Sequence, residues 1–309
     1  MFRVLNQMGP GLEPFLERAG LSEQVELIPL DPDEVDAPAA DALYGGWDAN
    51  PAALAVIRSR RVEWVHVGTT GVDQLPPDLL RSGVVFSCGR GVSGVPISEF
   101  VVASILARAK RFPDVWVGAP ASPMMLTLDA LEDATILVVG LGDIGQSVAR
   151  RLLPFGCEVI AYRRTAQPSP VDGVEVVTDL HAAVGRADHV VITCPLTDDT
   201  RGLFDAAVFA ALKPGAHLVN IARGAIIDEA ALRDALDGNL ALASLDVTDP
   251  EPLPEGHWLY THPRVHVSPH ISWSNPRQTE RFHRVFVENL AAYLAGEPLP
   301  GLVDVDARY

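Results

Sequence analysis

The sequence is poor in cysteine. Its 309 residues include only three cysteines, Cys88, Cys157 and Cys194, and each stands alone in an apolar stretch. No CxxC pair occurs, and no cysteine and histidine have the spacing of metal ligands, which excludes a disulfide framework and a structural zinc site. We therefore expect reduced thiols buried as small hydrophobic side chains, and no metal site.

Positive charge and long apolar runs are also scarce. Lysine and arginine together number 24 against 40 acidic residues, and this net charge of −16 disfavours nucleic acid or an anionic membrane as a partner. No apolar run approaches the roughly 18–20 residues that span a bilayer, and Met1–Gln7 lacks the apolar core of a signal peptide. These absences predict a cytoplasmic protein. They still allow a small anionic substrate, because a few local arginines outweigh a diffuse negative field at short range.

The sequence does contain enough apolar residues to form the hydrophobic cores of two domains. A chain of 309 residues, 48% of them hydrophobic, exceeds what one core normally supports. In the first hundred residues, short apolar runs alternate with segments of helical periodicity, which predicts a parallel sheet covered on both faces. The expected strands are 2–7, 25–30, 42–46, 62–67 and 84–88, and the expected helices are 12–19 and 51–60.

A longer helix, expected at 98–111, leads into a second series of strands and helices. The expected strands are 135–140, 158–162, 174–177, 189–196, 217–222, 241–247 and 265–268, and the expected helices are 144–155, 205–212 and 228–237. One more amphipathic helix, 278–295, follows a sheet that is already complete, so we expect it to return to the first domain. The predicted fold is α/β, with two Rossmann-like domains of doubly wound parallel sheets. In it, a dinucleotide-binding domain (98–273) is inserted into a flavodoxin-like, substrate-binding domain (1–97 and 274–309).

A glycine-rich turn, Gly140-Leu141-Gly142-Asp143-Ile144-Gly145, follows an expected strand and precedes an expected helix. This is the context of the dinucleotide-binding fingerprint. Gly140 would permit the tight turn, Gly142 would let a pyrophosphate approach the backbone, and Gly145 would let helix and strand pack closely. The amides at the helix start, including those of Asp143 and Ile144, would bind the anion. The alternative is a purely structural turn.

The end of the next strand favours NADP(H) as the coenzyme. An NAD-specific site has an acidic residue there, about 20 positions after the glycines, which binds the ribose hydroxyls. This strand ends instead in Arg163, Arg164 and Thr165. Because guanidinium groups bind phosphate through paired hydrogen bonds, we predict that these residues hold the 2′-phosphate of NADP(H), with NAD(H) as a secondary coenzyme. The alternative is a surface turn with two solvated arginines.

Three polar residues, Arg223, Glu251 and His270, each follow one of the last three expected strands. Parallel strands deliver their carboxyl ends to one edge of the sheet, where ligands bind, so these side chains should share a crevice. Hydride delivery to a ketone builds charge on oxygen. His270 can donate the proton, Glu251 would favour the protonated imidazole, and Arg223 can bind a carboxylate and polarise the ketone. The alternatives are a capping ion pair for Arg223, a solvated loop carboxylate for Glu251 and a core histidine for His270.

With these motifs the chain resembles the D-2-hydroxyacid dehydrogenase family, which includes glyoxylate/hydroxypyruvate reductases, phosphoglycerate dehydrogenases and formate dehydrogenases. The matching segments are the glycine turn, Cys194-Pro195-Leu196-Thr197 with Thr200, and residues 220–228, 245–254 and 268–270, in the family's order and spacing. The resemblance implies reduction of a small 2-keto acid, by default glyoxylate or hydroxypyruvate.

The resemblance also implies individual roles. Arg223 would be the substrate arginine, Glu251 its acidic partner and His270 the acid/base, and Asp246 would hold the nicotinamide carboxamide. The loop Thr69-Thr70-Gly71-Val72-Asp73 would bind the substrate carboxylate through its backbone amides. Further coenzyme contacts would come from Cys194, Pro195, Thr200, Ile221, Ala222, Arg223, Asp246 and His270.

Two further interpretations concern surfaces. Trp273 either lines the substrate pocket or packs at the domain interface. The resemblance also implies a homodimer, because the helix expected at 98–111 and the loop after it, with Trp116, Met124 and Met125 expected to be exposed, match the family's dimer arm.

Two other functions compete with a dehydrogenase. One is an NADP(H)-sensing interaction scaffold on the same fold, with vestigial catalysis. The other is an unrelated Rossmann oxidoreductase, such as an imine or sugar reductase, which would leave Arg223, Glu251 and His270 unexplained. A turnover assay with NADPH and a panel of 2-keto acids discriminates between the dehydrogenase and the scaffold.

Overall fold

The computed structural model describes residues 1–31, 33, 36–45, 50–59, 61–117, 119 and 127–306. It divides into two compact units, one of Met1–Ser93 with Asn275–Tyr309 and one of Gly94–Ser274. The expected divisions after residues 97 and 273 lie four residues and one residue from these boundaries. The expected element ends at Gly46 and Arg60, and also Met124 and Met125, lie outside the described residues.

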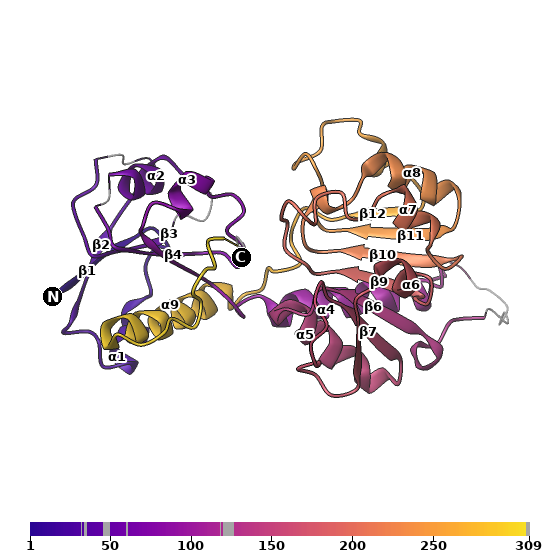
Figure 1. The fold of residues 1–309 in the computed structure, drawn as a ribbon, viewed down its shortest axis with the longest axis horizontal. Helices are drawn as coiled ribbons and strands as arrows, with labels where there is room; N and C mark the ends of the chain where they lie inside the picture. The colour runs from indigo at the N-terminus through magenta and orange to yellow at the C-terminus, as the bar shows by residue number, and fades with distance from the viewer. Residues whose placement is uncertain are drawn as a thin grey trace. The chain divides into compact units, whose positions relative to one another are not determined.

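The first unit contains a five-stranded parallel sheet with helices on both faces (Figure 1). Its strand order, β2-β1-β3-β4-β5, is the flavodoxin-like doubly wound order. The strands are β1 (Phe2–Asn6), β2 (Val25–Pro29), β3 (Ala42–Gly45), β4 (Trp64–Val67) and β5 (Val85–Cys88). Figure 1 shows α2 (Pro51–Arg58) and α3 (Pro77–Leu80) on one face, and α1 (Glu13–Arg18) and α9 (Gln278–Ala295) on the other.

The C-terminal helix α9 packs on this first sheet through stacked aromatic rings. Phe286 lies 4.0 Å from Tyr44 of β3, measured between ring centroids, and Tyr293 lies 4.9 Å from Trp64 of β4. Large aromatic side chains contribute much of the apolar area that a core buries. These contacts explain why a helix that follows the second sheet in sequence belongs to the first unit.

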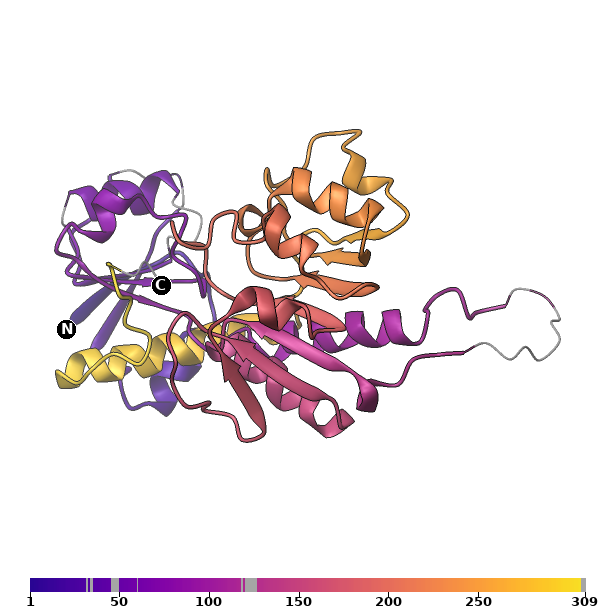
Figure 2. The same ribbon diagram turned by 45° about the vertical axis from the view of Figure 1, so that its right-hand side comes forward.

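The second unit contains a seven-stranded parallel sheet of order β12-β11-β10-β9-β6-β7-β8. Most of its strands are labelled in Figure 1, and Figure 2 shows the same ribbon turned by 45°. Its strands are β6 (Thr135–Val139), β7 (Glu158–Tyr162), β8 (Val174–Val177), β9 (His189–Ile192), β10 (Ala216–Asn220), β11 (Leu240–Leu245) and β12 (Val265–Val267). One face packs on α4 (Gly94–Ala109) and α5 (Asp143–Leu152), the other on α6 (Leu180–Val184), α7 (Ala206–Ala210) and α8 (Glu229–Asp237). The strand order reverses between β6 and β9, which is the place where doubly wound sheets bind ligands.

Some elements differ from the sequence prediction, and proline explains two of the differences. The strand expected at 189–196 ends at Ile192, and Pro195, which has no amide hydrogen, prevents the ladder from extending to residue 196. Helix α4 begins at Gly94 rather than at 98, since Pro96 fits a first helical turn, where the amide needs no partner. Helices α3 and α6 were not predicted, because four or five residues are too few to show a helical period.

Among the described residues, no helix is long and apolar enough to cross a membrane. In the same part of the chain, no group of three or more histidine, cysteine, aspartate or glutamate side chains is arranged to hold a metal ion. All three cysteines are buried, and burial raises the pKa of the Cys194 thiol to about 12. Such a thiol stays protonated and unreactive at neutral pH.

Candidate active site

The candidate catalytic residues leave neighbouring strands at one edge of the second sheet. Arg223 follows β10, Glu251 lies in the loop after β11, and His270 follows β12, and these three strands are adjacent and parallel. The glycine turn follows β6 at the same edge. Parallel pairing therefore brings together residues that are far apart in sequence.

The glycine turn is built by close contacts at Gly140 and Gly145. Gly140 has φ +101°, and a Cβ there would lie 2.8 Å from the backbone of Cys194. A Cβ at Gly145 would lie 2.1 Å from the Gly140 carbonyl oxygen, which also accepts a hydrogen bond of 2.6 Å from the Thr193 hydroxyl. A Cβ added at Gly142, the N-cap of α5, would meet no atom within 4 Å. The turn is thus tightly packed at Gly140 and Gly145. It is open at Gly142, at the N-terminus of α5, where an anion can bind.

The residues expected to bind the 2′-phosphate lie just beyond β7. Arg164 pairs with Asp199 at 3.0 Å, and the two side chains are 73% and 70% exposed. Asp199 has no signal in the sequence, since only folding brings the loop after β9 next to the end of β7. An exposed ion pair of this kind contributes little stability, so a phosphate can compete for the guanidinium.

Thr200 closes a turn in the loop after β9. Its hydroxyl donates to the Pro195 carbonyl at 2.6 Å and accepts from the Thr197 amide at 2.8 Å. Cys194 packs against Gly140 in the neighbouring turn. The contacts of Cys194, Pro195 and Thr200 with a coenzyme stay predictions, but these residues shape the loop beside the glycine turn.

The turn that carries Arg223 is organised by a buried asparagine. The Asn220 side chain accepts from the Ala222 amide at 3.0 Å and donates to the Arg223 carbonyl at 2.9 Å. The half-buried Arg223 directs one guanidinium nitrogen to the Ala222 carbonyl at 2.7 Å. Gly224 is required next, because a Cβ there would lie 2.0 Å from the Thr248 carbonyl carbon. This close approach ties the arginine turn to the loop that carries Glu251.

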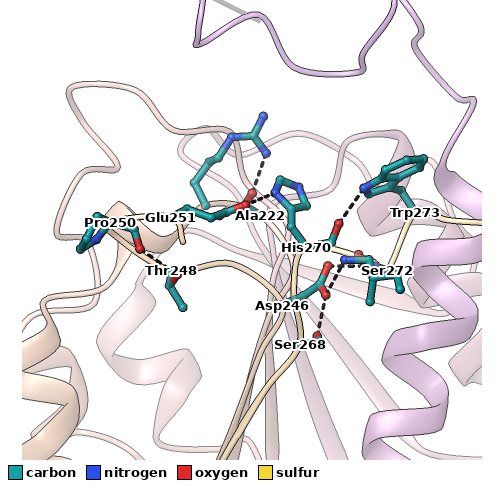
Figure 3. Close-up of polar contacts among 11 residues, drawn as sticks. Ala222, Asp246, Thr248, Pro250, Glu251, Ser268, His270, Ser272 and Trp273 are labelled. Atoms are coloured by element: carbon teal, nitrogen blue, oxygen red, sulfur yellow. Dashed lines mark hydrogen bonds and ion pairs between the residues drawn. The ribbon is translucent and has the colours of Figure 1, made fainter. Parts of the chain in front are cut away.

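Glu251 and His270 form a direct pair. The Nδ1 atom of His270 lies 2.6 Å from Oε1 of Glu251, and the two side chains point toward each other in Figure 3. The side chains of His270 and Glu251 are 35% and 40% exposed, so the pair is open to a small molecule. Because a carboxylate only accepts hydrogen bonds, Nδ1 must be the donor, which leaves Nε2 for proton exchange.

The structure gives Asp246 partners within its own chain. It is 1% exposed, and its carboxylate accepts hydrogen bonds from the Ser268 hydroxyl at 2.6 Å and from the amides of Ile271 and Ser272 at 2.9 Å (Figure 3). These contacts hold the loop around His270. The predicted contact of Asp246 with a carboxamide stays a prediction.

Trp273 lies on the same loop and is 41% exposed. Its indole N–H donates to the carbonyl oxygen of His270 at 2.7 Å (Figure 3). Neither of the roles expected from the sequence, a pocket wall or an interface contact, included this hydrogen bond.

The loop predicted to bind a substrate carboxylate follows β4 in the first unit. Thr69, Thr70 and Gly71 are half-buried. The Thr69 hydroxyl donates to the Gly71 carbonyl, and the Thr69 carbonyl accepts from the Gly89 amide at 2.7 Å. The loop thus has a defined conformation, and its contact with a carboxylate stays a prediction.

Four of the other histidines are buried in the cores. Nδ1 of His66 lies 2.8 Å from the Ser87 hydroxyl, and burial lowers the pKa of His66 to about 3. His189 and His217 contact each other at 3.1 Å, and burial lowers the pKa of both. His283 contacts Tyr44 at 3.2 Å. These four side chains pack inside the cores of the two units.

Comparison with known proteins gives a consistent result. Residues 103–272 match the family model described as "D-isomer specific 2-hydroxyacid dehydrogenase, NAD binding domain". The mouse glyoxylate reductase/hydroxypyruvate reductase is 33% identical over 266 residues, which cover 82% of this chain and 78% of that protein. The glyoxylate reductase of Thermofilum pendens is 32% identical over 290 residues, covering 90% and 80%.

Solved structures agree with the sequence matches. The NADPH-dependent glyoxylate/hydroxypyruvate reductase of Sinorhizobium meliloti, solved in complex with NADP and sulfate, superposes with a TM-score of 0.80 at 28% identity and covers 100% of both chains. The family model spans more than half of this chain, and the curated relatives exceed 30% identity over most of it. The chain therefore belongs to the D-isomer specific 2-hydroxyacid dehydrogenase family.

Proposed function

We propose that the protein is an NADP(H)-preferring reductase that interconverts a small 2-keto acid and the D-2-hydroxy acid. The observation that carries the proposal is the 2.6 Å contact between His270 Nδ1 and Glu251 Oε1, on strand ends next to that of Arg223. A histidine oriented by a carboxylate, beside an arginine, is what reduction of a ketone next to a carboxylate requires. The relatives named above support glyoxylate or hydroxypyruvate as the first substrates to test.

Each residue of this set has a distinct part in the proposal. With Nδ1 donated to Glu251, Nε2 of His270 carries the proton that passes to the substrate oxygen as the alkoxide forms. In the oxidation direction, neutral Nε2 accepts the hydroxyl proton. Arg223 binds the substrate carboxylate and stabilises negative charge on the reacting oxygen.

The residues around the glycine turn fit a nicotinamide dinucleotide, which supplies the hydride when bound. Gly142 leaves open space at the N-terminus of the ten-residue helix α5, where backbone amides bind a pyrophosphate. Arg163, Arg164 and Thr165 would hold the 2′-phosphate, and NAD(H) would bind more weakly because it lacks this group. The sequence Arg163-Arg164-Thr165 also contains no carboxylate that could bind the ribose hydroxyls of NAD(H), which supports the same preference for NADP(H) over NAD(H).

The proposal is tested by turnover with NADPH and with NADH against glyoxylate, hydroxypyruvate and larger 2-keto acids. His270→Ala should lower kcat by about 10²–10⁴, the usual effect of a positioned acid. His266→Ala is the matched control. It removes an exposed histidine from β12, the strand that precedes His270, and should keep the parental kcat. NADPH binding without turnover of any 2-keto acid would support the sensing scaffold instead.

We also propose a homodimer. Trp116 and Val117 are 70% and 71% exposed, and Phe112 stacks on Trp116 with ring centroids 5.0 Å apart. Exposed apolar side chains in such a group are unusual on a monomer and mark an interface. We propose that a second copy of this chain covers these exposed side chains. A sedimentation mass of one chain would contradict the assignment.

Finally, we propose a cytoplasmic location. A reducing compartment suits the buried thiols of Cys157 and Cys194, whose pKa values are raised by burial. Cell fractionation checks this, and recovery of the protein only from an oxidising compartment would contradict it.

A further inference from the structure

His270 has an unusual backbone conformation for a bulky residue. Its φ is +50°, in the left-handed region that side chains rarely adopt. Conformations of this kind persist only where the surrounding structure holds them, and they concentrate at functional sites. The contacts that hold His270 are therefore informative about its role.

Consecutive backbone groups around His270 are each held by a hydrogen bond. The His270 amide donates to the Asp246 carbonyl at 2.8 Å. The next two amides, of Ile271 and Ser272, donate to the buried Asp246 carboxylate at 2.9 Å. On the other side, the His270 carbonyl accepts the indole N–H of Trp273 at 2.7 Å. The left-handed residue is thus held through both its amide and its carbonyl (Figure 3).

The imidazole ring depends on this support. The His270 side chain is 35% exposed and Glu251 is 40% exposed, so packing around the pair is incomplete. The direction of Nε2 then follows from the backbone of His270, because φ sets where Cβ points. A misplacement on the order of 1 Å at a reacting group can lower a rate by about 10².

We propose that Trp273 is a positioning residue for His270. Its indole N–H fixes the His270 carbonyl while Asp246 fixes the amides around it, and together they aim Nε2 at the reacting oxygen. The inference rests on the proposed reductase function. It differs from a pocket-wall role, in which the ring of Trp273 would contact substrate and its N–H would not matter.

The substitution that separates these roles is Trp273→Phe, which keeps an aromatic ring and removes the donor. We expect kcat to fall by about tenfold, with the NADPH Kd and the substrate KM each within about twofold of the parent values. Trp258→Phe is the matched control, because Trp258 also donates its indole N–H, to Glu229 at 2.8 Å, in the same unit but on a different loop from His270. That variant should keep kcat.

A double-mutant cycle gives the decisive measurement. If Trp273 acts only through His270, then adding Trp273→Phe to His270→Ala should cause no further fall in kcat. Ser268→Ala, which removes one hydrogen bond to the Asp246 carboxylate, provides a second route to the same loop and should show the same dependence on His270. It also keeps the test informative if Trp273→Phe does not fold.

The possible outcomes are distinguishable. A Trp273→Phe enzyme with parental kcat, an equal loss in the His270→Ala background, or a rise in KM alone would each overturn the positioning role. If the parent enzyme turns over no 2-keto acid, the proposed function fails and the positioning role loses its basis.

Discussion

Gly142 and Gly145, two positions of one glycine-rich turn, should respond in opposite ways to alanine. A Cβ at 142 would meet no atom within 4 Å, and φ there is −75°, which any residue adopts. A Cβ at 145 would lie 2.1 Å from the Gly140 carbonyl oxygen, whereas real Cβ atoms keep at least 3.0 Å. The first position is therefore free of steric conflict in the protein itself, and the second is not.

The expected magnitudes follow from these contacts. In Gly142→Ala, the poorer N-cap costs up to about 1 kcal/mol of unfolding free energy. The reduced entropy of the unfolded chain offsets about 0.4–1 kcal/mol of that loss. Stability should therefore change little. NADPH binding should weaken at least about tenfold, because the added methyl occupies the space through which a pyrophosphate reaches the backbone. Gly145→Ala should lower the unfolding free energy by about 1–3 kcal/mol, since α5 must move away from the turn.

Urea unfolding measures the stability of both variants, and fluorescence titration with NADPH measures their affinity. The pattern that supports the assignment is a stable Gly142→Ala protein with weak NADPH binding. The reasoning would be refuted by a Gly142→Ala protein that binds NADPH as tightly as the parent. It would also be refuted if that variant lost more stability than Gly145→Ala.

Three further predictions concern coenzyme choice, acid stability and the arginine turn. Asp199→Asn, which removes the partner of Arg164, should raise kcat/KM with NADPH and leave the value with NADH unchanged; equal changes with both coenzymes would argue against the phosphate site. Burial lowers the pKa of His66 from 6.5 to about 3. The unfolded chain therefore takes up this proton first, so the contribution of His66 to the unfolding free energy is complete above pH 6.5 and should fall by about 1.4 kcal/mol per pH unit down to about pH 3. His66→Asn should reduce the slope of the unfolding free energy against pH by that amount in urea unfolding at several pH values, while the part due to His189, His217 and His283 remains. Val65→Ala should lower stability at every pH alike. Gly224→Ala, whose Cβ would overlap the Thr248 carbonyl, should displace the Glu251 loop and lower kcat by about 10² in the same turnover assay, and parental activity would contradict that coupling.

The architecture could be read from the sequence because its signals are local. The runs that became β6 and β9, with residues such as Ile136, Val138 and Val191, are apolar on both faces, and each has helical segments beside it. That pattern is typical of a parallel sheet covered on both sides. The candidate residues Arg223, Glu251 and His270 could be proposed for a similar reason, since each follows a strand and parallel strand ends share an edge.

What only the tertiary structure decided is how these side chains are held. Asp246 turns its carboxylate into its own loop, Trp273 donates to the His270 carbonyl, and Asp199 pairs with Arg164. None of these contacts has a periodic or motif signal, because each depends on the conformation of a loop between strands. The left-handed backbone of His270 is the clearest case. The residue type does not predict this conformation, because its energetic cost is balanced by hydrogen bonds that exist only after the ends of β11 and β12 lie side by side.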